Sequence, residues 1–259
     1  MAESDARDPT QRFSLAGRLA LVTGGSRGLG FAMAKGFARA GADVAIASRD
    51  LDSCRKAAAE IEALGRRAHP FACHVAHWEQ CERLVEEVYA RCGRVDVLVN
   101  NAGMSPIAPS SAETSEALYD KVLGVNLKGP FRLMALVGSR MAAGAGGSII
   151  NISSTASIRP TPQTAPYAAA KAGLNALTVA FAHEYGPKVR VNCIMAGPFH
   201  TDVSKGWSRS EWFTKHAREN FALGRAGDPD EIVGAALYLA SDASSFTTGA
   251  VLRIDGGLP

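Results

Sequence analysis

Residues 18–30 read Arg18-Leu-Ala-Leu-Val-Thr-Gly-Gly-Ser-Arg-Gly-Leu-Gly30, an apolar run that ends in a cluster of glycines. The run predicts a buried strand, and the residues from Leu29 to Ala40 predict a helix directly after it. A helix N-terminus offers unpaired N–H groups and a partial positive charge, and glycines let a phosphate come close to them. This segment therefore predicts a strand–turn–helix unit whose turn binds the pyrophosphate of a dinucleotide, the alternative being an ordinary glycine turn.

Outward from this unit, short apolar runs alternate with longer amphipathic ones along the chain. The alternation predicts a parallel sheet with helices on both faces, the doubly wound α/β class. No linker rich in Pro, Ser or charge interrupts residues 17–255, which indicates a single domain. We expect seven strands near residues 18–23, 43–48, 67–73, 95–99, 148–152, 189–194 and 250–254, and helices near 29–40, 50–64, 78–92, 115–143 with a break near Asn126, and 165–185.

The composition favours a packed globular protein, because 47% of the 259 residues are hydrophobic and the net charge is only +3. That charge balance gives no reason to expect a nucleic-acid or membrane partner, and the apolar runs are too short to span a membrane. Five cysteines without a Cys-x-x-Cys pair predict neither a disulfide framework nor a metal site, and favour reduced thiols in the cytoplasm. Residues 1–12 are polar, lack the pattern of a signal peptide and are expected to form a disordered tail ahead of one domain spanning 13–259.

Tyr167 and Lys171 are four residues apart in the expected helix 165–185, so both side chains lie on one side of it, about 6 Å apart. A free tyrosine titrates near pH ~10, which is too high for acid–base catalysis at neutral pH. A lysine charge ~5 Å away favours the phenolate by about 3 kcal/mol at an effective dielectric of ~20, which lowers the tyrosine pKa by roughly two units. The pair indicates an acid–base catalyst, although a tyrosine and a lysine on a solvated face have the same spacing.

Two further polar residues are ambiguous when each is taken alone. Ser154 follows the expected strand 148–152, and open α/β sheets bind ligands at the carboxyl ends of their strands, but a turn serine would occupy the same place. Asn126 lies in an apolar helical stretch and needs hydrogen-bond partners there, which a break in the helix would supply.

The motifs above occur with two others in a set order: Thr23-Gly-x-x-x-Gly-x-Gly30, Asn100-Asn-Ala-Gly103, Asn126, Ser154, Tyr167-x-x-x-Lys171 and Asp255-Gly-Gly257. This order and spacing resembles the short-chain dehydrogenase/reductase family from about Gly17 to the C-terminus. The resemblance implies a seven-stranded Rossmann-type fold and hydride transfer between a nicotinamide dinucleotide and a small-molecule ketone or secondary alcohol. It also implies a homotetramer built on two long helices, roughly residues 127–143 and 165–185.

By resemblance, Tyr167 gives a proton to the carbonyl oxygen in reduction and takes one from the alcohol in oxidation. Ser154 stabilises the charge that develops on that oxygen. Lys171 lowers the Tyr167 pKa and holds the nicotinamide ribose, and Asn126 keeps a water that links Lys171 to solvent. The cofactor-binding residues implied in the same way are Gly24, Ser26, Arg27, Gly28, Leu29 and Gly30 at the phosphates, Asn101, Ala102 and Gly103 beside the adenosine ribose, and Phe199 and Thr201 at the nicotinamide amide.

Two positions depart from the family pattern. An Asp-Val pair normally follows the third strand, where the Asp takes the adenine amino group; this chain has His74-Val75, and a neutral imidazole can still accept through one nitrogen. After the sixth strand the family has Pro-Gly where this chain has Ala196-Gly197, which we expect to loosen the turn beneath the nicotinamide. Neither departure touches the catalytic residues.

The residues at the end of the second strand favour NADP(H) over NAD(H). NAD enzymes of this kind place an acidic residue there to bind the ribose diol, whereas this chain has Ser48 and Arg49. Arg27 on the glycine loop brings a second guanidinium, and such groups bind a 2′-phosphate. Two solvated surface arginines with NAD(H) as the cofactor are the alternative, and Asp50 fits an N-cap of the next helix.

Residues 200–223 are expected to form a lid over the substrate. Their aromatic residues indicate an apolar or partly apolar pocket, or only the packing of a lid helix: Trp207, Trp212, Phe213, His216 and Phe221. The overall sequence is similar to 3-oxoacyl-thioester reductases and to gluconate 5-dehydrogenase-like members of the family, which leaves a thioester, a sugar acid or a small ketone as the substrate. A non-catalytic dinucleotide-binding sensor or scaffold is the rival function, but it would not need the three catalytic residues together.

Overall fold

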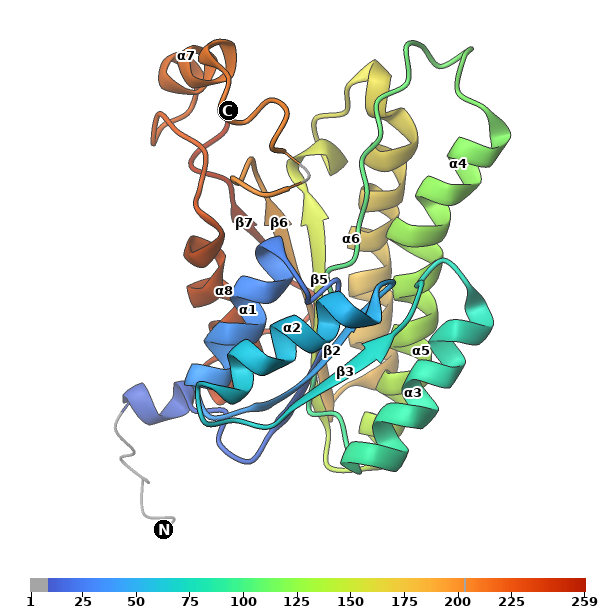
Figure 1. Cartoon of the computed structure of the whole chain (residues 1–259), viewed down its shortest axis with the longest axis vertical. Helices are drawn as coiled ribbons and strands as arrows, with labels where there is room; N and C mark the ends of the chain where they lie inside the picture. Colours follow the sequence, from blue (N-terminus) through green and yellow to red (C-terminus); the bar gives the residue numbers. More distant parts are fainter. Residues whose placement is uncertain (1–8, 203) are drawn as a thin grey trace.

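The sheet is the centre of the computed structural model, which describes residues 9–202 and 204–259. Its seven strands lie in the order β3-β2-β1-β4-β5-β6-β7, and every neighbouring pair is parallel (Figure 1). The single-domain Rossmann-type fold expected from the sequence is therefore confirmed. The strands are β1 (Leu19–Thr23), β2 (Asp43–Ser48), β3 (Ala68–Ala72), β4 (Val97–Asn100), β5 (Gly147–Ser154), β6 (Val189–Ala196) and β7 (Val251–Ile254).

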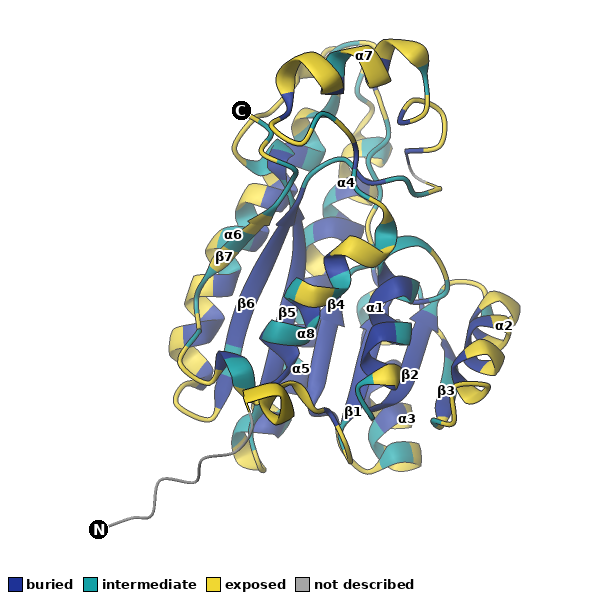
Figure 2. Cartoon of the chain, turned by 90° about the vertical axis from the view of Figure 1, so that its left-hand side faces the viewer, coloured by how far each residue is buried: buried dark blue, intermediate teal, exposed yellow. Residues whose placement is uncertain are grey.

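Helices cover both faces of the sheet, and each face has its own hydrophobic core (Figure 2). Successive strand residues point to opposite faces, so Val22 packs in one core with Phe37 and Leu21 packs in the other with Met134. Strands buried on both sides are mostly apolar, as β1 is at the centre of the sheet, whereas β7 at its edge is partly exposed and includes Arg253. The first core takes α1 (Gly28–Arg39), α2 (Leu51–Glu62) and α8 (Val233–Ala240), and the second takes α3 (Trp78–Cys92), α5 (Gly129–Ala143) and α6 (Ala165–Tyr185).

Local signals in the sequence set two of the helix boundaries. The Asp50 carboxylate accepts a hydrogen bond from the Ser53 N–H at 2.6 Å, which confirms the predicted N-cap of α2. The helical stretch after residue 115 divides into α4 (Glu116–Leu123) and α5, with a π-helical turn at Gly124–Lys128 between them. The predicted break near Asn126 is this turn.

Some elements differ from the prediction. Helix α8 was not expected, because Val233–Ala240 is apolar all round and has no amphipathic period. The short helix α7 (Glu211–Asn220) lies within the expected lid, above the carboxyl end of the sheet (Figure 1). Part of the predicted disordered tail is a 3-10 helix at Pro9–Phe13, while residues 1–8 lie outside the described residues.

Other expectations concern cysteines, metals and membranes. All five cysteines are free thiols. Within residues 9–202 and 204–259, no cluster of His, Cys, Asp or Glu is placed to hold a metal ion. No helix in that same part of the chain is long and apolar enough to cross a membrane.

One tight helix contact generates a prediction about stability. A Cβ at Gly129, the first residue of α5, would collide with the backbone carbonyl of Val75, which lines the cavity described below. We expect Gly129→Ala to lower the free energy of unfolding by about 1–3 kcal/mol, because backbone must move to admit the methyl group. Gly234→Ala in α8 is the matched control: nothing lies within 4 Å of its Cβ, so it should be neutral or stabilising by up to about 1 kcal/mol. Urea unfolding measures the free energy of unfolding of both variants. Equal changes in the two would show that the methyl group at residue 129 meets no obstacle.

Candidate active site

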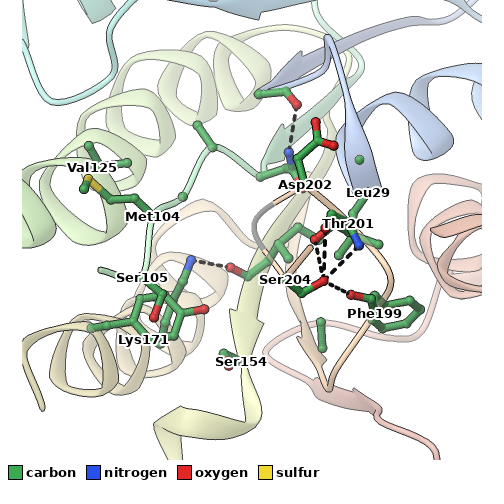
Figure 3. Close-up of a pocket in the computed structure, with 18 of the residues that line it drawn as sticks. Leu29, Met104, Ser105, Val125, Ser154, Lys171, Phe199, Thr201, Asp202 and Ser204 are labelled. Carbon is green, nitrogen blue, oxygen red and sulfur yellow. Dashed lines mark hydrogen bonds between the residues drawn. The ribbon is translucent and has the colours of Figure 1, made fainter. Parts of the chain in front are cut away.

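A cavity of about 1250 Å³ lies at the carboxyl ends of the strands, and residues of α7 line part of it. Figure 3 shows some of the residues that line it. Open α/β sheets bind their ligands at this edge. Only Gly30 and Asn126, among the residues predicted for the site, do not line it. The predicted residues that line it are Gly24, Ser26, Arg27, Gly28, Leu29, Ser48, Arg49, His74, Val75, Asn101, Ala102, Gly103, Ser154, Tyr167, Lys171, Phe199 and Thr201.

The glycine loop presents the N-terminus of α1 to this cavity. Helix α1 begins at Gly28, and no side chain caps its first N–H groups. Uncapped N–H groups at a helix start are suited to bind phosphate. A Cβ at Gly30 would collide with the Gly24 carbonyl oxygen and the Asn101 amide, so a glycine here lets α1 pack closely on the loop.

Asn101 holds the glycine loop in place. Its Nδ2 donates to the carbonyl oxygens of Thr23, at 3.0 Å, and Gly24, at 3.1 Å. The Thr23 hydroxyl accepts from the backbone N–H groups of Asn101 (3.1 Å) and Ala102 (3.2 Å) and donates to Val99 O at 3.1 Å. Asn101 therefore positions the loop, and Thr23, the first residue of the glycine motif, supports it in a role that the sequence did not predict.

Ser154 and Tyr167 meet at the inner wall of the cavity. Ser154 is the last residue of β5, and its Oγ accepts from the Ala156 N–H at 3.2 Å. Tyr167 lies in the first turns of α6, half-buried. Burial raises the pKa of Tyr167, and a hydrogen bond with the Ser154 side chain lowers it in part.

Lys171 is 3% exposed, and its Nζ donates to Ile152 O at 2.7 Å (Figure 3). The ammonium lies 5.8 Å from the centre of the Tyr167 ring. Burial lowers the pKa of Lys171 to about 8. The net lowering of the Tyr167 pKa that the spacing predicted is therefore not found for the site as the protein's own residues build it. Burial disfavours the charged forms of both side chains and outweighs the attraction between them.

Asn126 is fully buried in the π-helical turn. Its Nδ2 donates to Val122 O and Met104 O, both at 2.9 Å, and its Oδ1 accepts from Met104 N at 3.3 Å. Gly103 lies between Asn126 and Lys171: a Cβ there would lie 3.1 Å from Asn126 Oδ1 and 3.6 Å from Lys171 Nζ. The side chain thus ties the segment after β4 to the helix break, and its role in a water relay stays a prediction.

The far end of the cavity, at β2 and β3, holds the residues predicted to bind the adenosine. Ser48 Oγ donates to Asp50 O at 3.1 Å. Arg49 is exposed and forms no ion pair within the described part of the chain. Arg27 pairs with Asp202 at 3.7 Å, a partner that the sequence did not reveal, because nothing in the chain marks which exposed charges meet.

His74 differs from the expectation for the adenine contact. Burial lowers its pKa, so the imidazole is neutral at pH 7. Its Nδ1 accepts from the Ala76 N–H at 3.3 Å, which places the ring hydrogen on Nε2. The free nitrogen is therefore a donor, not the acceptor that we expected.

The segment after β6 is tied down by buried hydrogen bonds. Ser204 Oγ donates to Phe199 O at 2.5 Å and accepts from the Thr201 N–H at 3.0 Å (Figure 3). The Gly197 N–H donates to Ile254 O at 2.9 Å, so the turn after Ala196 remains anchored to β7, contrary to the loosening we expected. Ser204 is a second residue that the sequence analysis missed, and a serine three residues after Thr201 carries no distinctive signal.

A family model described as enoyl-(acyl carrier protein) reductase matches residues 24–259. The dehydrogenase/reductase SDR family member 4 of Homo sapiens is 34% identical over 255 residues, which cover 96% of this chain and 90% of the relative. The chain belongs to the short-chain dehydrogenase/reductase family. It is therefore an NAD(P)-dependent oxidoreductase, as the order of its motifs predicted.

Other relatives in the family differ in their named substrates. A 3-oxoacyl-(acyl-carrier-protein) reductase of Thermotoga maritima is 38% identical and covers 94% of this chain and 98% of its own length. A solved gluconate 5-dehydrogenase from Burkholderia cenocepacia, in complex with NADP and tartrate, has a TM-score of 0.91 at 35% identity and covers 97% of this chain and 98% of its own. The family membership fixes the reaction class, and the substrate has to be argued from the site.

The buried lysine generates a prediction about pH. The Lys171 pKa is about 8 in the folded protein, against 10.5 for an ordinary lysine. Between these values the unfolded chain binds more protons than the folded one, so stability rises with pH. We expect the free energy of unfolding of the wild type, relative to Lys171→Met, to rise by up to about 3 kcal/mol across this window.

Urea unfolding at stepped pH tests this expectation. Lys215→Met, at an exposed position of α7, controls for the loss of a lysine. The difference in unfolding free energy between the wild type and this control should not rise across the same pH window. Parallel pH curves for the wild type and Lys171→Met would mean that Lys171 titrates normally in the folded protein.

Proposed function

We propose that the protein interconverts a ketone and a secondary alcohol with NADP(H) as the favoured cofactor. One observation carries the proposal: Ser154, Tyr167 and Lys171 line the same cavity as the uncapped N-terminus of α1. The N-terminus of α1 would hold the pyrophosphate of a dinucleotide, and the three side chains at the end of β5 and on α6 would hold the reacting groups. A dinucleotide sensor or scaffold would need the phosphate site alone.

In this mechanism the reduced dinucleotide, when bound, supplies the hydride to the carbonyl carbon. Ser154 Oγ donates a hydrogen bond to the carbonyl oxygen, and Tyr167 transfers its phenolic proton to that oxygen as negative charge develops there. Because burial raises the Tyr167 pKa, the phenol is protonated at neutral pH and ready for reduction. Lys171 holds the nicotinamide ribose, and its proximity favours the phenolate that remains after transfer.

Tyr167→Phe tests the proton transfer. The substitution removes only the hydroxyl, so we expect turnover of any ketone that the wild type reduces to fall at least about a hundredfold, while NADPH affinity stays within about threefold. Tyr119→Phe, at an exposed tyrosine of α4 outside the cavity, is the control and should be fully active. More than a tenth of wild-type turnover in Tyr167→Phe would remove Tyr167 from its role.

The preference for NADP(H) rests on the charges at the adenosine end. Arg49 is exposed beside Ser48, with no carboxylate within the described residues to neutralise it. Arg27 already forms an ion pair with Asp202, so Arg49 is the stronger candidate for a 2′-phosphate contact. His74 Nε2–H can donate to a ring nitrogen of the adenine.

Arg49→Ala should weaken NADPH binding by about tenfold and leave NADH binding unchanged, since NADH has no phosphate there. Arg27→Ala should have a smaller effect, and adding Ser48→Asp to Arg49→Ala should reverse the preference. Arg55→Ala in α2, which pairs with Asp52 outside the cavity, is the control. Measured affinities and kcat/KM for both cofactors decide it: a wild type that already prefers NADH would show that the arginines are solvated surface residues.

Two wider expectations remain predictions. A homotetramer built on α5 and α6 is supported by the exposed apolar side chains of Phe131 and Val179 on those helices. A cytoplasmic location rests only on the composition and the cysteines, and one relative, the dehydrogenase/reductase SDR family member 2 of Homo sapiens, is named as mitochondrial.

A further inference from the structure

The charged residues of the cavity are confined to its cofactor half. Arg27 and Asp202 form a pair at the glycine loop, Arg49 and Asp50 follow β2, and Lys171 lies beneath the catalytic tyrosine. Lys121 contributes its charge to the surroundings of His74, at the adenine end. No other Asp, Glu, Lys or Arg among the described residues lines the cavity.

The wall formed by residues 204–221 is aromatic instead. Trp207, Trp212, Phe213, His216 and Phe221 all line the cavity. Phe213 packs edge-on against Trp207, with ring centres 4.9 Å apart, and Phe221 closes the same cluster. Trp212 remains 70% exposed and Trp207 39% exposed. When an apolar group covers large exposed aromatic faces beside a binding cavity, the free energy of the complex falls.

His216 is the one histidine of this wall, and its ring is already engaged by neighbouring side chains. Asn220 Nδ2 donates a hydrogen bond to His216 O at 2.8 Å. The same Nδ2 lies 3.2 Å from His216 Nδ1, within hydrogen-bond distance. The imidazole also stacks on Trp212, with ring centres 5.4 Å apart and planes 5° from parallel.

A sugar acid is a poor match for this half of the cavity. Its carboxylate would lose hydration without a cation or a charged hydrogen-bond donor to replace it. Ser105, Ile107, Ala156 and Thr164, which also line the cavity, are uncharged and offer no substitute. The site thus differs from what the names of the gluconate-type relatives would suggest.

We infer that the substrate is an uncharged ketone that carries a flat, apolar group, an aryl ketone in the simplest case, whose ring lies against Trp207 and Trp212. The inference rests on the proposed function, because it places the carbonyl at Ser154 and Tyr167. Those residues line the same cavity as the aromatic wall.

NADPH consumption with a matched panel tests the substrate class: propiophenone, butanone, 5-keto-D-gluconate and acetoacetyl-CoA. We expect kcat/KM for propiophenone to exceed that for each of the others by at least about tenfold, because only the aryl ketone covers the tryptophan faces without bringing a charge. A higher kcat/KM for 5-keto-D-gluconate or acetoacetyl-CoA would overturn the inference and leave the proposed function standing. No turnover of any panel member, with NADPH bound, would overturn both.

Two variants locate the determinants. Trp212→Ala should lower kcat/KM for propiophenone by about tenfold and change that for butanone by less than about threefold, since butanone has no ring to cover. His216→Arg should raise kcat/KM for 5-keto-D-gluconate by about tenfold, because it adds the missing cation. Phe13→Ala, at an exposed aromatic outside the cavity, is the matched control.

The variants also separate specificity from folding. Trp212 is largely exposed, so Trp212→Ala should keep the wild-type melting temperature and NADPH affinity. If it keeps both and loses propiophenone and butanone turnover equally, or loses neither, the aromatic wall does not select the substrate and the inference is wrong.

Discussion

The hydrogen bonds between the carboxyl ends of β1 and β4 are the constraint on which the site depends. The Thr23 hydroxyl and the Asn101 amide join the two strand ends in both directions, through the backbone of Thr23, Gly24 and Ala102. β1 and β4 are neighbours in the sheet although two strands intervene in the chain, so this is the point where the strand order reverses. A crevice opens at such a point in any doubly wound sheet. Here the hydrogen bonds of Thr23 and Asn101 fix the bottom of the crevice and the direction in which the glycine loop faces.

The sequence predicted the strands well because parallel strands buried on both faces leave a simple signature of short apolar runs. It predicted α2 and the α4–α5 break because Asp50 and Asn126 are polar residues with a specific local task. Helix α8 was missed for the opposite reason, since its apolar residues give no period to detect. A signal was present just before it: Asp228 and Glu231 form a capping box at the start of Pro229–Ile232.

Site residues could be predicted where a motif fixes their spacing, as for Tyr167 and Lys171, but their electrostatics could not. The spacing placed a charge beside a phenol, and Coulomb's law then suggested a lowered phenol pKa. The tertiary structure buries both groups, and desolvation outweighs the attraction. The partners of Arg27 and Thr201 were hidden likewise, because Asp202 and Ser204 become partners only through the path of the chain after β6.

The two halves of the cavity are built by different kinds of interaction. The cofactor half consists of strand ends and a helix N-terminus held by backbone hydrogen bonds, so its shape follows from the fold itself. The substrate half consists of aromatic side chains on a segment whose own small core comprises Phe213, Ala217, Phe221 and Ala226. Substitutions in that segment change the lining without disturbing the sheet, since its core is separate from the two that hold the helices on the strands. Relatives with one fold and one reaction can therefore differ in the side chains that line this part of the cavity, because the motifs that define the family lie elsewhere in the chain.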